Sequence, residues 1–391
     1  MKVLLTSHLF PNRVEPISGV FIKEQVDFLR RECEIKVVAP VPWFPPVGGF
    51  GRWSQFNEVP WRRELDGIEV FHPRYLIFPR MAVISIAWFT YLLALYKVGK
   101  RLDFDIIHVH TAYPEGVAAV VFARMTRRPV IVTIHGADIN VFIKRRALRR
   151  MIVWALSRSD AVISISEELR RKIGPLGVPA ERVTVIPNGV DFRLFRPIPR
   201  DVAETEKGLS KGKERVVYIG RFDPRKGLAV LIRAISILSS SRDNIELLLV
   251  GAKRGDEAEF AGLVERLGLT ERVTFINEVP LTEVPLWLSA SDLLVLPSFT
   301  EGLPLVLIEA LACGKPVVST RCGGPEEIVT DGTGLLVPPG DHQALAEAIA
   351  YVLDHPEEYN PVQIATYARN RFDLERISER IIDLYSSVIR N

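Results

Sequence analysis

Short apolar runs, separated by segments of helical period, recur along the whole chain. Val, Ile and Leu dominate these runs, and such continuous runs alternate with helices in parallel sheets that are covered on both faces. Two successive sets are visible. The first contains VLLT, IKVVAPV, DIIHVHT, PVIVTIHG, DAVISIS and VTVIPNG, and the second contains RVVYIGR, IELLLVG, VTFINEV, DLLVLPS, PVVST and GLLVPP. The pattern predicts an α/β protein with two doubly wound, parallel-sheet (Rossmann-like) domains.

A polar stretch without helical or strand period separates the two sets. It runs over residues 193–214, contains prolines and glycines, and predicts a linker. We therefore expect an N-terminal domain over residues 1–192 and a C-terminal domain over residues 215–370. Residues 371–391 are rich in helix formers, and we expect them to form a C-terminal helix that packs back toward the N-terminal domain. The opening MKVLLTSHLFPN lacks the features of a signal peptide and predicts a strand.

A long connection in the first half, over residues 41–67, carries Trp43, Trp53 and Trp61. Long loops inside compact domains tend to be functional. Two interpretations stay open. The segment is either a loop folded onto its own aromatic side chains, or an acceptor-binding or membrane-interface surface with Trp43 and Trp53 as its candidates.

Two further segments of the first half bear on a membrane. Residues 81–96 carry no charge, but sixteen residues fall short of the roughly 20 that span a bilayer, so we expect a buried or membrane-grazing helix. Residues 144–151, KRRALRRM, form a basic cluster that opens another helix. This cluster is either an ordinary solvated face or part of a membrane surface, and the candidates for the second interpretation are Arg145, Arg146, Arg149 and Arg150.

The charge is unevenly distributed along the chain. Lys and Arg total 50 and Asp and Glu total 47, but residues 1–190 hold 27 basic and 17 acidic side chains, whereas residues 191–391 hold 23 and 30. A basic half suggests an anionic partner such as nucleic acid, a membrane surface or a phosphorylated substrate. The widely spaced Cys33, Cys313 and Cys322 exclude a disulfide framework and a CxxC metal site, and favour a reducing, cytoplasmic compartment.

The candidate chemistry centres on EGLPLVLIE, which begins with Glu301 and ends with Glu309. The surrounding pattern predicts a strand, a loop and a helix from Pro304 to Gly314. Glu301 then lies at the carboxyl end of a strand, where doubly wound sheets bind ligands. Free amides in the first helical turn favour an anion, and Gly302 lets it approach closely. This arrangement suits a phosphate attached to sugars better than the carboxylates, about 5 Å apart, of a retaining glycosidase.

A second loop of the same half supplies positive charge. GRFDPRKG, residues 220–227, follows a predicted strand and carries Arg221 and Lys226. Arg offers a bidentate fork and Lys a point charge, so together they can balance a diphosphate without a metal.

The segments GRFDPRKG, SFTEGLPLVLIEALACGKPVVST, CGGPEEIV and DGTGLLVPPGD together resemble the retaining glycosyltransferases of family 4 (group 1), whose hallmark is two glutamates separated by seven residues. In the first half, SGVFIKEQ, HVHTAYPEG, TIHGAD and IPNGVD stand where that family carries similar segments. The resemblance covers nearly the whole chain. It implies the GT-B architecture, in which two Rossmann-like domains face each other across a cleft.

The resemblance also implies how the second half binds its donor. Glu309 would hold the ribose hydroxyls, and Glu301 would lie beside the donor sugar. Arg221 and Lys226 would bind the diphosphate, helped by the backbone at Gly302, Leu303, Pro304 and Leu305.

Further roles follow from the same resemblance. Gly19 would approach the diphosphate, and His135 would approach the reacting sugar. Asn277 stands where the family more often has glycine, before the loop that reads the nucleobase, and Val279 is a further donor-binding candidate. The implied catalytic residues are His135, Arg221, Lys226 and Glu301.

Two motifs favour a metal site only formally. The DFD of residues 103–105 matches the DxD of metal-dependent sugar transferases but precedes a strand at its amino end, so we interpret it as a strand entry. His108 and His110 alternate along a strand and point the same way, yet no neighbouring carboxylate or cysteine completes a site, and we expect core or pocket-wall histidines. We expect neither a metal nor a cofactor.

We therefore predict transfer of a sugar from a UDP- or GDP-sugar to an acceptor hydroxyl, with retention of configuration, in cell-envelope polysaccharide or glycolipid synthesis. The expected partners are the nucleotide sugar, a lipid-linked or saccharide acceptor and, peripherally, the cytoplasmic membrane face; nucleic acid is not expected. Two alternatives stay open: a nucleotide-sugar binding or regulatory protein, and a GT-B epimerase or phosphorylase. A binding or regulatory protein would have no reason to keep all five polar site residues, His135, Arg221, Lys226, Glu301 and Glu309. A phosphorylase normally needs a cofactor lysine motif that we do not find.

Overall fold

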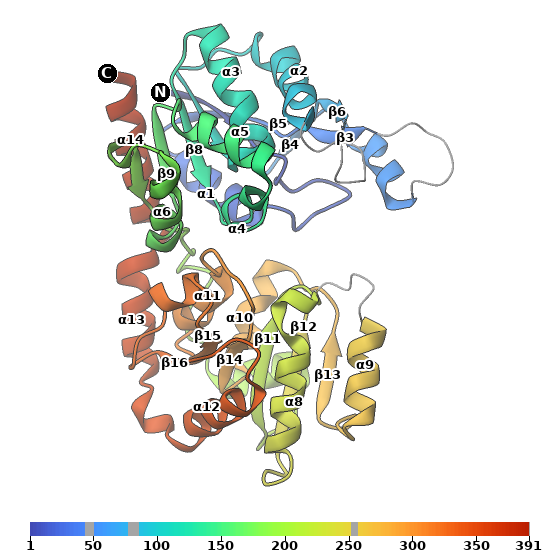
Figure 1. Cartoon of the computed structure of the whole chain (residues 1–391). Coiled ribbons are helices and arrows are strands. Elements are labelled where there is room, and N and C mark those ends of the chain that lie inside the picture. The colour runs from blue at the N-terminus through green and yellow to red at the C-terminus, as the bar shows by residue number, and fades with distance from the viewer. Residues whose placement is uncertain (44–50, 77–85, 252–256, 391) are drawn as a thin grey trace. The chain divides into compact units, whose positions relative to one another are not determined.

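The computed structural model describes residues 1–43, 51–76, 86–251 and 257–390. The chain divides into two compact units (Figure 1). Unit 1 comprises Met1–Gly189 and Leu374–Asn391, and unit 2 comprises Val190–Asp373. Each unit is built around its own largely parallel sheet with helices packed against it.

In unit 1 the described residues form an eight-stranded sheet of order β10-β9-β8-β7-β1-β2-β5-β4. All neighbouring strands are parallel except β4, which is antiparallel to β5. The strands are β1 (Lys2–Thr6), β2 (Glu34–Val38), β4 (Arg62–Leu65), β5 (Ile68–Phe71), β7 (Ile106–His110), β8 (Val130–Ile134), β9 (Ala161–Ser164) and β10 (Val183–Val185). The helices are α1 (Val20–Leu29), α2 (Ala87–Gly99), α3 (Val117–Thr126), α4 (Ala137–Asn140), α5 (Arg146–Leu156), α6 (Glu167–Ile173) and α14 (Leu374–Arg390).

In unit 2 the described residues form a six-stranded parallel sheet of order β13-β12-β11-β14-β15-β16. The strands are β11 (Glu214–Ile219), β12 (Ile245–Val250), β13 (Val273–Ile276), β14 (Leu293–Leu296), β15 (Val317–Thr320) and β16 (Gly334–Val337). The helices are α7 (Arg200–Lys207), α8 (Leu228–Leu238), α9 (Glu257–Arg266), α10 (Val284–Ser289), α11 (Leu305–Ala312), α12 (His342–Asp354) and α13 (Pro361–Phe372).

The strand order locates the ligand-binding edge of each sheet. Counted along unit 2, the order is 3-2-1-4-5-6, which reverses between β11 and β14. In unit 1 the same reversal falls between β1 and β7, because β1 pairs with β2 on one side and with β7 on the other. Doubly wound sheets bind ligands outside the carboxyl ends of the strands at such switch points. The prediction of two doubly wound domains is confirmed, and every predicted apolar run coincides with a strand.

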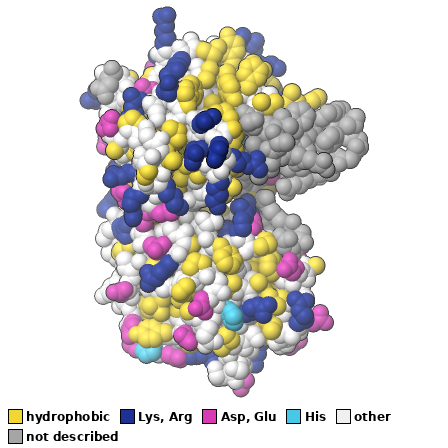
Figure 2. All heavy atoms as spheres, in the orientation of Figure 1, with side chains coloured by type: hydrophobic (Ala, Val, Ile, Leu, Met, Phe, Trp, Pro, Cys, Tyr) yellow, Lys and Arg dark blue, Asp and Glu magenta, His cyan; other side chains and the backbone are white. Residues whose placement is uncertain are grey.

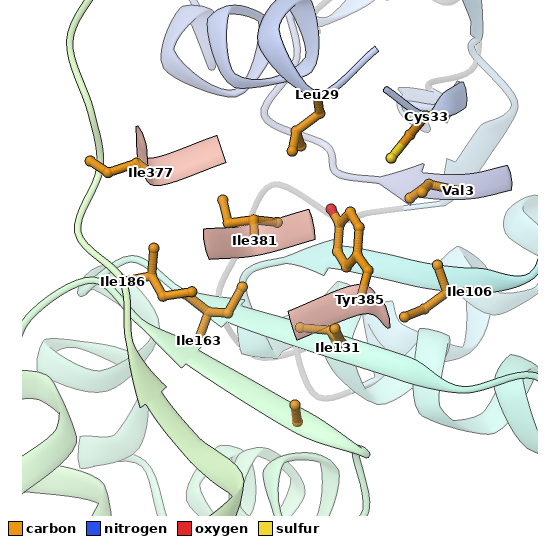
Figure 3. Close-up of a cluster of buried hydrophobic side chains, with 11 residues drawn as sticks. Val3, Leu29, Cys33, Ile106, Ile131, Ile163, Ile186, Ile377, Ile381 and Tyr385 are labelled. Carbon is orange, nitrogen blue, oxygen red and sulfur yellow. The ribbon is translucent and has the colours of Figure 1, made fainter. Parts of the chain in front are cut away.

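Helix α14 completes the core of unit 1 (Figure 3). Its residues Ile377, Ile381 and Tyr385 recur every four positions and therefore share one helical face. This face packs on buried residues of the sheet and of α1, which include Val3, Leu29, Ile106 and Ile131. The last helix in the sequence is thus part of the same hydrophobic core as the first strand.

The segment predicted as a linker, residues 193–214, is folded instead. Helix α7 lies within it, and the segment belongs to unit 2. The apolar period is weak because one of the buried contacts of α7 is ionic: Glu204 is 4% exposed and its Oε1 lies 2.6 Å from Nη1 of the fully buried Arg215. A hydrophobic pattern does not detect a helix held in this way.

The aromatic segment 41–67, predicted as one long loop, contains short elements: β3 (Val41–Trp43), a 3₁₀ helix (Gly51–Glu58) and β4. Strand β3 pairs with β6 (Arg74–Leu76). Val41 packs in a small buried cluster with Phe56 and Val59. Trp43 is 39% exposed, whereas residues 44–50 and the side chain of Trp53 lie outside the described part of the chain.

The uncharged segment 81–96 is described from Ile86 onward, and its helix is α2, which continues to Gly99. One face of α2 is buried through Tyr91, Leu95 and Val98. The opposite face exposes Ile86, Phe89, Leu93 and Tyr96. Among the described helices, none has the length and apolar character needed to cross a membrane.

Candidate active site

Two loops meet at the switch point of unit 2. The loop after β11 carries GRFDPRKG, and the loop after β14 leads to α11. The backbone N–H of Phe299 donates to the carbonyl of Arg225 at 2.9 Å and ties the loops together. Gly227 has a φ of 71°, and a Cβ there would lie 2.0 Å from the carbonyl oxygen of Pro297. Only glycine fits at this crossing, which fixes the position of the preceding Lys226.

A lysine and a glutamate pair across these two loops. Lys226 Nζ lies 2.6 Å from Glu301 Oε1, and Ser298 Oγ donates to the same oxygen at 2.6 Å. The side chain of Lys226 is 24% exposed and that of Glu301 is 11% exposed, so the ion pair is partly shielded from water. Glu301 Oε2 makes no hydrogen bond within the described residues. The pair presents one positive group and one free acceptor atom at the edge where ligands bind.

The helix after this loop starts with open amides. Pro304 is the N-cap residue and no side chain caps the first turn of α11. The helix is slightly shorter than the predicted range of Pro304 to Gly314. Helix α11 runs from Leu305 to Ala312, and Gly314 follows it with a φ of 73°. Uncapped N–H groups and the helix dipole favour an anion at this end. Glu309 is half-buried on the second turn, as predicted.

The remaining residues predicted for donor binding lie along the same edge. Arg221 is exposed after β11, and its carbonyl accepts from the hydroxyl of Tyr218 at 2.7 Å. Asn277 is exposed and Val279 half-buried in the segment after β13. The structure thus brings every predicted donor residue of unit 2 to the carboxyl ends of β11, β13 and β14.

In unit 1, Gly19 and His135 also lie at the carboxyl edge of the sheet. Gly19 precedes α1 with a φ of 67°, and a Cβ there would lie 2.2 Å from the carbonyl oxygen of Leu9. His135 directly follows β8, and its Nε2 lies 2.9 Å from Nδ1 of His110. Burial lowers the pKa of His135 to about 3, so its ring is neutral near pH 7.

Comparison with known proteins decides the family. The model described as Glycosyltransferase Family 4 matches residues 19–194, and the one described as Glycosyl transferases group 1 matches residues 200–371. A Bacillus subtilis protein, TuaC, named as a teichuronic acid biosynthesis glycosyltransferase, is 30% identical over 92% of this chain and 91% of its own length. The chain belongs to the family 4 (group 1) glycosyltransferases.

Other similar proteins agree with this assignment. The GDP-mannose-dependent alpha-(1-6)-phosphatidylinositol monomannoside mannosyltransferase of Mycolicibacterium smegmatis is 28% identical over 93% of this chain and 92% of its own. Sucrose-phosphate synthase from Thermosynechococcus elongatus superposes with a TM-score of 0.84 at 23% identity, covering 100% and 99% of the two chains. Anabaena HepE in complex with UDP-glucose superposes with a TM-score of 0.76 at 24% sequence identity. The match covers 99% of this chain and 100% of the HepE chain. The fold of this glycosyltransferase is GT-B.

Sequence reasoning missed two polar residues of this glycosyltransferase at the switch point of unit 1. His8 follows β1, and Glu115 follows β7. Glu115 is fully buried and accepts from the backbone N–H of His8 at 3.1 Å. Glu115 lies within the segment HVHTAYPEG, but His8 is far from it in the sequence. Only the pairing of β1 with β7 brings the two residues together, so no local motif identifies the pair.

Residues of the two motifs that formally match metal sites, DFD and the His108–His110 pair, bond to other residues of unit 1. Lys2 Nζ lies 2.5 Å from Asp103 Oδ2, and the backbone N–H of Lys2 donates to Asp105 Oδ2 at 2.8 Å. His108 Nε2 lies 2.7 Å from Oγ1 of Thr133. Within the described residues, no three His, Cys, Asp or Glu side chains are grouped so that they could hold a metal ion.

The basic cluster predicted to open a helix does so, because α5 begins at Arg146. Arg145, the N-cap residue, and the other three arginines of the cluster, Arg146, Arg149 and Arg150, are exposed, whereas Leu148 and Ile152 face the core. Figure 2 shows Lys and Arg side chains gathered over this part of unit 1, and apolar side chains over the region of α2. The basic surface contains the four arginine candidates of this glycosyltransferase, whereas the candidate Trp43 lies on β3.

Proposed function

We propose that the protein transfers a sugar from a nucleoside diphosphate sugar to an acceptor hydroxyl with retention of configuration. The observation that carries this proposal is the Lys226–Glu301 pair beside the uncapped first turn of α11. A diphosphate needs cations and amide donors, and a sugar needs carboxylate acceptors. Both kinds of group meet at one switch point.

In the proposed reaction the bond between the anomeric carbon and the diphosphate oxygen breaks, and a bond from the same carbon to the acceptor oxygen forms on the same face. The departing diphosphate takes the proton of the acceptor hydroxyl, so no further base is required. Lys226 and Arg221 stabilise the charge that grows on the leaving group. Glu309 holds the ribose, and His135 and Gly19 serve the reacting sugar and the diphosphate.

Relatives and neighbours suggest the substrate classes. TuaC is named for teichuronic acid biosynthesis and the mycolicibacterial relative for a phosphatidylinositol mannoside, which supports a polysaccharide or glycolipid acceptor of the cell envelope. The HepE structures contain UDP or UDP-glucose, and the mycolicibacterial relative is named as GDP-mannose-dependent. Both UDP- and GDP-sugars are therefore candidate donors.

The direct test is to incubate the protein with a panel of UDP- and GDP-sugars and to measure nucleotide release. Release from one donor supports a transferase, and anomeric analysis of the product tests retention. Tight binding without release from any donor would contradict the proposal and favour a binding or regulatory protein. An epimerised donor would indicate an epimerase, and a sugar phosphate formed with added phosphate would indicate a phosphorylase.

Turnover is expected to survive EDTA, because Arg221 and Lys226 supply the positive charge that a metal would otherwise provide. Nucleotide release is measured after dialysis against EDTA, with and without added Mn²⁺ or Mg²⁺. The variant Asp103→Asn serves as a control and should retain full activity. Complete loss of turnover on chelation, restored by either metal, would contradict this prediction.

We further propose that unit 1 contacts the anionic cytoplasmic membrane face and receives its acceptor there. The exposed apolar face of α2 can insert among the lipids, and the exposed arginines at the start of α5 can attract anionic headgroups. Peripheral membrane proteins bind through these two interactions. Each basic residue near an anionic surface contributes about 1 kcal/mol at low salt.

Replacing Arg145, Arg146, Arg149 and Arg150 with Glu is expected to abolish binding to vesicles that contain anionic lipid. The measurement is cosedimentation at rising ionic strength, and wild-type protein should dissociate as salt increases. The same change at Arg124, Arg127, Arg128 and Arg158 is the matched control, since these exposed arginines belong to unit 1 but not to this cluster. Equal loss in both variants would show that only net charge matters, and absence of wild-type binding would remove the membrane contact.

A further inference from the structure

A buried glutamate lies behind an accessible histidine at the switch point of unit 1. The Glu115 side chain is 0% exposed, whereas that of His8 is 35% exposed. Glu115 Oε1 contacts His8 Nδ1 and also accepts from the His8 backbone N–H at 3.1 Å. Glu115 Oε2 accepts from the hydroxyl of Thr111 at 2.6 Å. Both carboxylate oxygens are thus occupied, and one holds the imidazole in a single orientation.

The contact determines what His8 offers to a ligand. A carboxylate only accepts hydrogen bonds, so the His8 nitrogen that faces it, Nδ1, carries a proton. When the ring is neutral, the proton on Nδ1 leaves a lone pair on Nε2. His8 therefore presents a fixed hydrogen-bond acceptor at the carboxyl edge of the sheet.

Backbone strain accompanies this arrangement. Thr111 has a φ of 82°, in the left-handed region that β-branched residues rarely adopt, and its hydroxyl is bonded to Glu115. Such strain persists where the surroundings enforce it, and it clusters at functional sites. A carboxylate needed only to hold Thr111 would not require a histidine on its other oxygen.

The position of the pair fits a binding role. His8 is followed by Leu9, whose carbonyl packs against Gly19. β1 and β7 are neighbours at the switch point, and His8 and Glu115 follow these two strands. The pair therefore lies at the ligand-binding edge of unit 1. Glu115 falls within the segment HVHTAYPEG, but the sequence predicted no role for either residue.

We infer that His8 is an acceptor-binding residue and Glu115 its positioning residue. His8 Nε2 accepts a hydrogen bond from a hydroxyl of a saccharide acceptor that neighbours the attacking hydroxyl. The proton of the attacking hydroxyl remains available to the departing diphosphate. This inference rests on the proposed function.

Three substitutions separate this role from a merely structural one. His8→Asn places its amide near Nδ1 and keeps the contact with Glu115, but it removes the acceptor atom at Nε2. His8→Gln places an amide oxygen near Nε2 instead. Glu115→Gln preserves the shape of the carboxylate but supplies an N–H donor, which favours the opposite tautomer of His8, by the same logic as the Asp-to-Asn change in a catalytic triad.

Transfer of the sugar to a methyl glycoside acceptor, with the donor identified in the panel, is the first readout. His8→Asn and Glu115→Gln are expected to lower kcat/KM for this acceptor about 10- to 100-fold, with little change in KM for the donor. His8→Gln should recover several-fold over His8→Asn. Unfolding temperatures and nucleotide binding, which depends on unit 2, are measured on each variant and should match wild type. An unchanged kcat/KM for the acceptor in His8→Asn would overturn the inference.

The second readout does not depend on turnover. In ¹⁵N-histidine NMR spectra, His8 is expected to carry its proton on Nδ1 in wild type and on Nε2 in Glu115→Gln. Titration with a panel of methyl glycosides should shift His8 Nε2 in wild type. A proton on Nε2 in wild type, or no shift with any glycoside, would overturn the acceptor role. If no nucleotide sugar releases its nucleotide, the proposed function fails, and the NMR result still decides whether His8 binds saccharides.

Discussion

Replacing Lys226 with Ala is expected to lower turnover about a hundredfold, which corresponds to roughly 3 kcal/mol of lost transition-state stabilisation. Lys226 Nζ lies 2.6 Å from Glu301 and beside the first turn of α11, so its charge is already in place when the diphosphate departs. Donor affinity should fall less than turnover, because negative charge on the leaving group grows mainly in the transition state. Arg221→Ala should have an effect in the same direction.

The same loop provides a matched control. Arg225 lies one residue before Lys226 and carries the same charge, but its guanidinium bonds to Asp223 at 2.6 and 3.0 Å and its side chain is exposed. Arg225→Ala should therefore retain turnover within a few-fold of wild type. Steady-state kinetics with the donor identified in the panel measure all three variants. Near-wild-type turnover in Lys226→Ala and Arg221→Ala would remove the diphosphate assignment.

Replacing Tyr385 with Ala is expected to lower the free energy of unfolding of unit 1 by about 3–5 kcal/mol, the usual cost of deleting a large buried aromatic side chain. Tyr385 is fully buried in the core that α14 shares with the sheet, and its hydroxyl lies 2.5 Å from His108 Nδ1. Tyr385→Phe removes only that hydrogen bond and should cost about 1 kcal/mol.

Because the chain holds two units, a single unfolding curve would mix their stabilities. Hydrogen exchange read by mass spectrometry separates them: amides of β1 and β7 should lose protection in Tyr385→Ala, whereas those of β11 and β12 should not. Tyr351→Ala on α12 is the surface control, since Tyr351 is 41% exposed. Unchanged protection of β1 in Tyr385→Ala would show that α14 contributes little to the core.

The sheets were predictable because their strands are buried on both faces and therefore appear as continuous apolar runs. The placement of Lys226, Glu301 and Glu309 at the carboxyl edge of the unit 2 sheet was predictable because these residues lie in short motifs directly after strands. Helix α7 was missed because its buried residue Glu204 forms an ion pair with Arg215. A hydrophobic pattern does not identify a charged residue as buried. His8 and Glu115 were missed because their partnership depends on the strand order, which a single sequence does not display.

The discontinuous composition of unit 1 has a consequence for biosynthesis. Leu374–Arg390 are translated after all of unit 2, although they fill the same core as Lys2–Thr6. Unit 2 therefore has its complete set of residues before unit 1 does, which reverses the usual order in which the amino-terminal domain folds first on the ribosome. Until α14 arrives, Val3, Leu29, Ile106 and Ile131 lack their cover, and this nascent intermediate is the stage at which chaperones would bind and proteases would cleave the chain.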